Sequence, residues 1–155
     1  MERAKVEAAL QSTRFYRMTC GLPALVQAMS IDRIVVKAGS IMGITMPGSL
    51  GEAVALDMTA EARAVGAIVG HHRSGRWTFI VRSDLPTDEY ERLFPELFRM
   101  DVWLVRDGAE IALPVSPTDV FRFWVGTEPP RDTFRPAASV VLESVHRVRK
   151  SNHAR

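Results

Sequence analysis

The sequence predicts a single α+β domain with a mostly antiparallel sheet of about six or seven strands and helices packed on it. Short apolar runs separated by turn residues predict strands joined as hairpins. Helical spacing appears between these hairpins but not after every strand, so the alternation of a doubly wound parallel sheet is missing. The length of 155 residues is that of one domain.

Two helices are expected near the N-terminus. Spacings of three and four residues place Val6, Ala9 and Leu10 on one face of a helix over residues 2–13. Proline is favoured at the first helical position, because its fixed φ suits the helix and the missing N–H would have no intrahelical partner. Residues 23–29, which begin with a proline, are therefore expected to form a short second helix.

The next segment changes from strand to helix patterning. Apolar, largely β-branched runs at residues 34–36 and 41–46 flank a small-residue turn and predict a hairpin. Ser49 and Glu52 have the spacing of a capping box, in which a hydroxyl and a carboxylate satisfy free amides at a helix start. Residues 49–66 are expected to form that helix.

The middle of the chain predicts a second hairpin and a helix. Residues 67–69 and 77–81 flank a glycine-bearing turn, and apolar and polar side chains alternate along the second run. Thr87, followed by two acidic residues, suits a helix N-terminus. Pro95 interrupts the apolar stripe of this helix, so a kink or two short helices are expected. The stripe comprises Tyr90, Leu93, Phe94, Leu97 and Phe98.

A third hairpin, a strand and a helix complete the chain. Asp107-Gly108 lies between apolar runs at residues 102–105 and 110–113 and supplies the positive φ angles of a type I′ turn. Residues 121–125 predict a further strand. A last helix begins at a proline, residue 136. Its inward face should comprise Ala138, Val141, Leu142, Val145 and Val148.

Composition and charge are those of an ordinary globular protein. Apolar residues make up 46% and charged residues 25%, which argues against disorder. The single cysteine, Cys20, cannot form an intramolecular disulfide, which favours the cytoplasm. No apolar run approaches the roughly 20 residues that span a bilayer, so no membrane partner is expected. The domain should cover residues 1–150, followed by a basic, disordered tail over residues 151–155.

The sequence contains no complete catalytic motif and no metal-ligand spacing. His71 and His72 are adjacent, so a strand would point them to opposite faces; they form a possible polar site instead of a metal site. Cys20 has apolar neighbours and fits a small core residue. The aspartates fall mostly at turns and helix ends, where they have structural roles. We therefore predict no catalytic residue, metal or cofactor, and favour a protein that is not an enzyme.

Three segments between residues 66 and 145 carry a family resemblance. Residues 70–79 are a glycine-bearing turn that leads into an aromatic strand, and residues 107–109, Asp-Gly-Ala, precede an apolar run that ends in Pro-Val-Ser at residues 114–116. Phe123 and Trp124 follow. This order resembles the bifunctional DNA primase/polymerase N-terminal domains of the archaeo-eukaryotic primase superfamily.

The resemblance implies a fold but not the activity of that family. Its members transfer nucleotides with two metal ions, which an acid-x-acid pair on a strand holds in place. This chain has no such pair: the nearest candidate, residues 57–59, lies in a predicted helix. The histidine of the family falls where this chain has Trp77 or Thr78. The first functional hypothesis is therefore a non-catalytic, primase-like module that binds nucleic acid or nucleotide phosphates.

Two functions of different classes remain open. In the first, arginines on two hairpins bind phosphates and an exposed indole stacks on a base. The residues expected there are Arg73, Arg76, Trp77, Arg122 and Trp124. The same tryptophans could instead pack in the core, with the arginines on strand edges. In the second, the chain is a protein-interaction or regulatory module with a protein partner and no nucleic-acid role. Three methionines that suit adaptable surfaces favour it, namely Met42, Met46 and Met58.

Overall fold

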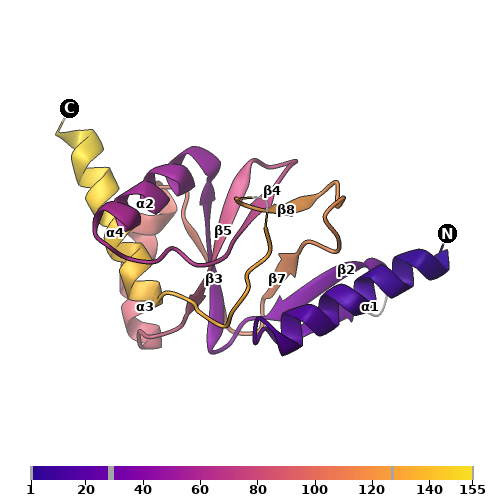
Figure 1. Cartoon of the computed structure of the whole chain (residues 1–155). Helices are drawn as coiled ribbons and strands as arrows, with labels where there is room; N and C mark the ends of the chain where they lie inside the picture. Colours follow the sequence, from indigo (N-terminus) through magenta and orange to yellow (C-terminus); the bar gives the residue numbers. More distant parts are fainter. Residues whose placement is uncertain (1, 28–29, 127, 155) are drawn as a thin grey trace.

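A computed structural model describes residues 2–27, 30–126 and 128–154, and for residues 2 and 30–32 it describes the backbone alone. Figure 1 shows the arrangement of the helices and strands. The helices are α1 (Glu2–Met18), α2 (Gly48–Ala60), α3 (Thr87–Arg99) and α4 (Ala138–His153). The strands are β1 (Ala24–Gln27), β2 (Ser30–Lys37), β3 (Ile41–Pro47), β4 (Ile68–His71), β5 (Arg76–Arg82), β6 (Trp103–Val105), β7 (Glu110–Leu113) and β8 (Arg122–Trp124).

The strands form two sheets. The larger one has five strands in the order β6-β3-β5-β4-β8, and the smaller one has three in the order β1-β2-β7. Every pair of neighbouring strands within these sheets is antiparallel. The predicted α+β class and its antiparallel pairing are therefore confirmed, although the strands divide between two sheets and do not form one.

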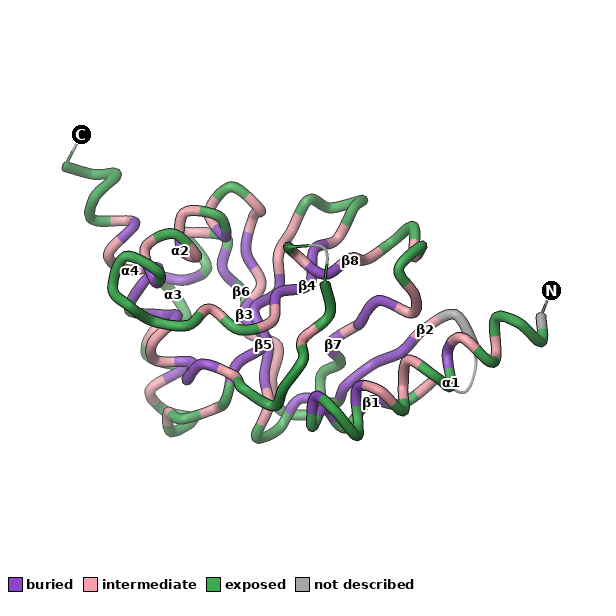
Figure 2. Tube along the Cα trace, in the orientation of Figure 1, coloured by how far each residue is buried: buried purple, intermediate pink, exposed green. Residues whose placement is uncertain are grey.

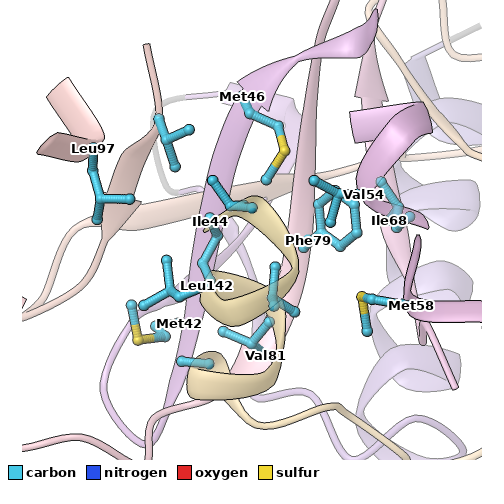
Figure 3. Packing of buried hydrophobic residues seen from close by; sticks show 14 of the residues in the cluster. Met42, Ile44, Met46, Val54, Met58, Ile68, Phe79, Val81, Leu97 and Leu142 are labelled. Carbon is cyan, nitrogen blue, oxygen red and sulfur yellow. The ribbon is translucent and has the colours of Figure 1, made fainter. Parts of the chain in front are cut away.

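Three helices cover one face of the five-stranded sheet. In Figure 1, α2, α3 and α4 lie together on the side away from the N-terminus. Apolar side chains from β3 and β5, including Ile44 and Phe79, meet Val54 of α2 and Leu142 of α4 in a buried cluster (Figure 3). The predicted inward face of α4 packs in this cluster, so that prediction is confirmed. The face comprises Ala138, Val141, Leu142, Val145 and Val148.

The second core lies on the other side of the five-stranded sheet. There Val69 of β4 and Ile80 of β5 pack with Ile34 and Ile111 of the small sheet and with Tyr16 of α1. Figure 2 shows the buried stretches of β2, β5 and β7 that contribute to it. The five-stranded sheet is thus the middle layer, and its second face is the one on which a site can form beside the small sheet.

Two predicted hairpins are wrong, because the chain crosses between sheets at both turns. Residues 34–36 lie in β2 and residues 41–46 in β3, which belong to different sheets; the same holds for β6 and β7. Asp107 and Gly108 do have the predicted positive φ angles, 53° and 86°. The two crossings lie side by side, since Ala38 N–H donates to Ala109 O at 2.8 Å and Gly108 N–H donates to Ala38 O at 3.0 Å.

The remaining hairpin prediction is confirmed: β4 and β5 pair directly around the turn that contains Gly75. The helix expected from Thr87 is also present, and α3 runs through Pro95 as one helix. Its predicted stripe is only partly buried. Tyr90 and Leu97 face the core, whereas Phe94 and Phe98 are 59% and 62% exposed.

Two further local predictions are wrong. Residues 24–27 form strand β1 and not a helix, because pairing with β2 satisfies their backbone and buries Ala24 completely; residues 28 and 29 lie outside the described residues. The capping box is absent too. Helix α2 begins at Gly48 with no side-chain cap, and its first amide donates to Gly75 O at 2.9 Å.

Both ends of the chain are more helical than predicted. Helix α1 extends to Met18, five residues beyond the predicted end at residue 13, and Leu10 is exposed. Helix α4 continues through residues 151–153, where the sequence predicted a disordered tail. Helical hydrogen bonding explains the correction, since Ala154 N–H still donates to Lys150 O at 3.1 Å. Residue 155 lies outside the described residues.

Candidate anion-binding site

Strand register brings polar side chains together at one end of the five-stranded sheet. Thr45 of β3 pairs with both Trp103 of β6 and Thr78 of β5, and His71 of β4 pairs with Arg122 of β8. Side chains at paired positions share a face, so all of these point to the same side. Together with Arg76 and with Arg33 of β2 they line a cavity of about 300 Å³ next to the small sheet, which we call the arginine pocket.

Arg76 is fixed in place by four polar contacts. Its Nη2 donates to the carbonyl oxygens of Thr45 and Asp101 at 2.9 and 2.8 Å, and its Nε donates to Thr45 Oγ1 at 3.2 Å. Its Nη1 lies 3.1 Å from the Asp101 carboxylate. The guanidinium carbon also lies 4.3 Å from the ring centroid of Trp103, a cation–π distance. Arg76 therefore forms a rigid wall of the pocket.

Arg33 and Arg122 are less well satisfied. Among the described residues, no partner accepts a hydrogen bond from the buried Nε of Arg33. Burial lowers the pKa of Arg122, and the charge of Arg33 lowers it further, while Asp119 opposes this effect. Two like charges thus face a partly desolvated space, which costs free energy unless an anion joins them.

The surroundings of His71 favour its neutral form. Burial lowers its pKa from 6.5, and the charges of Arg122 and Arg76 lower it further. Its Nε2 lies 3.0 Å from Thr78 Oγ1, within hydrogen-bond distance. The imidazole can therefore present a donor to the pocket without an added charge, and it can gain a proton if an anion offsets the two arginines.

Carboxylates are scarce in the arginine pocket. Of the described lining residues only Glu110 is acidic, and its Oε1 accepts a hydrogen bond from Gln27 at 3.0 Å. Across residues 2–27, 30–126 and 128–154, no three His, Cys, Asp or Glu side chains gather closely enough to hold a metal ion. The donor set of this pocket, guanidinium, imidazole and hydroxyl, suits an anion.

The structure places three of the predicted residues in this pocket and four elsewhere. Arg76, Arg122 and His71 line it. Arg73 is exposed in the β4–β5 turn and does not line the pocket. Trp77 packs against the first core, Trp124 lies in the second core, and His72 is exposed beside Phe123.

The two predicted tryptophans are not free to stack on a base. Trp124 is only 8% exposed, and its Nε1 donates to the Tyr16 hydroxyl at 3.2 Å. Trp77 packs at Gly51 of α2 and belongs to the first core. His72 stacks on Phe123 at a centroid distance of 4.4 Å, on the far side of the β4–β8 pair from His71. For Trp124 the structure therefore agrees with the alternative that the tryptophan packs in the core, and not with base stacking.

Sequence reasoning missed Arg33 and Trp103. Arg33 reaches the site from the smaller sheet, so its position depends on how the two sheets pack. Trp103 is the exposed tryptophan at this site, with 51% of its surface accessible. Its exposure follows from the position of β6 at the edge of the large sheet, and the sequence alone does not show which strand is an edge strand.

Comparisons with known proteins yield nothing for this chain: no protein-family model matches it, and no curated protein or solved structure does. Of the helices in the described part of the chain, none is both long and apolar enough to cross a bilayer.

Proposed function

We propose that this protein is a non-catalytic module that binds a phosphate-bearing ligand, a nucleotide or a single-stranded nucleic acid, in the arginine pocket. The observation that carries the proposal is the convergence of Arg33, Arg76 and Arg122 on one cavity. Arginine forks match phosphate oxygens in geometry, and each forms paired hydrogen bonds with them.

Charge balance supports an anionic ligand. Arg76 is already paired with Asp101, which leaves Arg33 and Arg122 facing Glu110 alone among the described lining residues. A phosphate between the two guanidiniums would remove their mutual repulsion and give the buried Arg33 Nε an acceptor. The threonine hydroxyls of β3 and β5 are further donors at the same end of the sheet.

Trp103 supports a ligand that carries a base. Its indole lies at the pocket and is half exposed, with Arg76 over one face. A base stacked on an aromatic side chain is worth about 1–3 kcal/mol and requires no particular sequence. The sequence resemblance to primase/polymerase domains suggests the same class of ligand. In this proposal the phosphate lies between the arginines and the base on Trp103.

The proposal is tested by fluorescence anisotropy with labelled single-stranded DNA and RNA oligonucleotides over a range of salt concentrations. Affinity should fall steeply with added salt, because phosphate contacts release counterions. Arg33→Gln and Arg122→Gln should each weaken binding by about 1–3 kcal/mol and reduce the salt slope by about one. Arg73→Gln is the matched control, since Arg73 is exposed and lies outside the pocket.

Competition with inorganic phosphate and with a mononucleotide separates a phosphate site from a strand-binding site. A strand-binding site should respond more strongly to the oligonucleotide than to either competitor. Absence of binding at low salt removes the proposal. Equal losses in all three arginine variants also remove it, because a diffuse surface effect would then explain the binding.

A protein-interaction role is the alternative function, but the methionines that favoured it in the sequence do not support it in the structure. Met42, Met46 and Met58 are completely buried in the first core, so they cannot form an adaptable surface. Figure 3 shows them packed among the core side chains of the large sheet and α2.

A further inference from the structure

A second cavity lies between α1, the β7–β8 connection and strand β8. Its volume is about 530 Å³, within the range of small-molecule sites. Five of its lining residues are aromatic, namely Phe15, Tyr16, His72, Phe123 and Trp124. We call it the aromatic cavity. It shares no lining residue with the arginine pocket.

The walls of the aromatic cavity are held rigidly. Tyr16 meets Trp124 edge to face at 5.6 Å, and its hydroxyl donates to Pro114 O at 2.5 Å while accepting a hydrogen bond from Trp124 Nε1. Ser12 Oγ donates to Val115 O at 2.6 Å, which ties α1 to the β7–β8 connection. A preformed cavity binds a ligand with little ordering cost.

Prolines in its wall also hinder collapse of the aromatic cavity. Three prolines line it, at positions 114, 117 and 129, and their rings restrict the backbone there. An apolar space of this size offers few hydrogen bonds to water, so displacing water from it is favourable.

The polarity of the lining restricts the class of ligand. No described lining residue is an acid or a permanently charged base. A cation would lack a carboxylate partner, and an anion would lack an arginine or lysine. Gln11 and His72 are exposed polar lining residues, so each can bind one polar group at the edge of a ligand.

We propose that the aromatic cavity binds an uncharged aromatic small molecule with a hydrogen-bonding group at its edge. The ligand ring would lie against the rings of Trp124 and Tyr16, which fix each other, in offset or edge-to-face contact. The polar edge would face Gln11 or His72. This proposal is independent of phosphate binding, because the two sites have separate walls.

Titration of the full-length, ¹⁵N-labelled protein with 2-naphthol, followed by NMR, tests the proposal. Saturable shifts are expected for the side-chain N–H of Trp124 and for the backbone amides around Pro114 and Phe123. Gln11→Trp, which adds bulk to the lining, should weaken binding at least tenfold. Arg14→Trp is the matched control; Arg14 is exposed on the same helix and outside the lining, so affinity should stay within twofold.

Two charged relatives of the probe complete the test. Naphthalene-2-sulfonate and 2-naphthyltrimethylammonium carry the same ring with opposite charges, and both should bind the aromatic cavity at least tenfold more weakly than 2-naphthol. Tighter binding by either ion overturns the proposal. Absence of saturation with 2-naphthol, or equal affinities of wild type and Gln11→Trp, overturns it as well. Shifts confined to the arginine pocket also count against it and leave the phosphate proposal unaffected.

Discussion

At the scale of the residue, the proposed anion binding should depend on pH through His71. Burial and the charges of Arg122 and Arg76 lower the pKa of His71 from 6.5, which favours the neutral imidazole when no anion is bound. A bound phosphodiester would favour the protonated form and raise that pKa. Affinity for a single-stranded oligonucleotide should therefore rise as pH falls below about 6.5, the ordinary pKa of histidine.

Oligonucleotide titrations at a series of pH values, with wild type and His71→Gln, measure this effect. The variant should show a flat response across the same range, since phosphodiesters do not titrate there. The stability of the protein without a bound anion should change in the opposite direction to the affinity as pH falls. A histidine whose folded-state pKa is lowered binds fewer protons in the folded protein, so the empty wild type should lose stability as pH falls through this range. A pH response retained in His71→Gln would contradict the assignment.

Arg76 has a structural role that a lysine cannot fill. Its guanidinium bonds to Thr45 and Asp101 at once and lies over Trp103, whereas a lysine ammonium lacks the planar fork. Asp101, which Arg76 contacts through both its carbonyl and its carboxylate, has a left-handed φ of 59° just after α3. Arg76→Lys should lower the free energy of unfolding by about 1–3 kcal/mol.

Urea denaturation measures the change, and Arg73→Lys is its control. Arg73 is exposed in the turn, so its replacement should change stability by less than about 0.5 kcal/mol. Equal stabilities of the two variants would show that the Arg76 contacts contribute nothing to the fold.

At the scale of the element, α2 approaches β5 so closely that a glycine is required at position 51. A Cβ there would lie 2.8 Å from Cε3 of Trp77 and 3.1 Å from its Cβ. Alanine is the better helix former by about 1 kcal/mol. Overpacking outweighs this gain, so Gly51→Ala should destabilise the protein by about 1–3 kcal/mol.

Ser49→Ala is the matched comparison in the first turn of α2. A capping serine contributes about 1 kcal/mol, but Ser49 is exposed and forms no cap. Thermal and urea denaturation should therefore show little change for Ser49→Ala and a clear loss for Gly51→Ala. A stabilised Gly51→Ala variant would mean that Trp77 moves aside freely.

At the scale of the whole molecule, sequence periodicity predicted the fold class but not the division into two sheets. The local turn chemistry at Asp107-Gly108 was interpreted correctly, as the φ angles show. Long-range packing decides whether the two strands on either side of a turn pair with each other. The alternation of apolar and polar residues along each strand holds no information about this pairing. At Gly75 the two flanking strands do pair with each other, so the hairpin prediction is correct there. At the two crossings the flanking strands belong to different sheets, so the hairpin predictions fail.

The same limit applies to the candidate site. His71, Arg76 and Arg122 come from a confirmed hairpin and from the strand that pairs with it, so a sequence pattern could suggest them. Arg33 belongs to the other sheet, and Trp103 to the opposite edge of the large one. Their convergence is a property of the assembled sheets, and no local spacing records it.

The paired crossings between the sheets allow one glycine to be compared with another. Gly39 and Gly108 lie in the two crossings, and a Cβ at either would meet open space. They differ in backbone conformation, because Gly108 has a φ of 86° and Gly39 is not among the glycines with positive φ. Gly108→Ala should cost roughly 1–2 kcal/mol, the penalty of a side chain in a left-handed conformation. Gly39→Ala should be neutral or slightly stabilising, since alanine restricts the unfolded chain by about 0.4–1 kcal/mol.

Because these crossings join the sheets that form the arginine pocket, urea denaturation of Gly108→Ala should keep one cooperative transition at a lower midpoint. Two separate transitions would show that the sheets unfold independently, and equal midpoints for the two variants would show that the positive φ at Gly108 is not required.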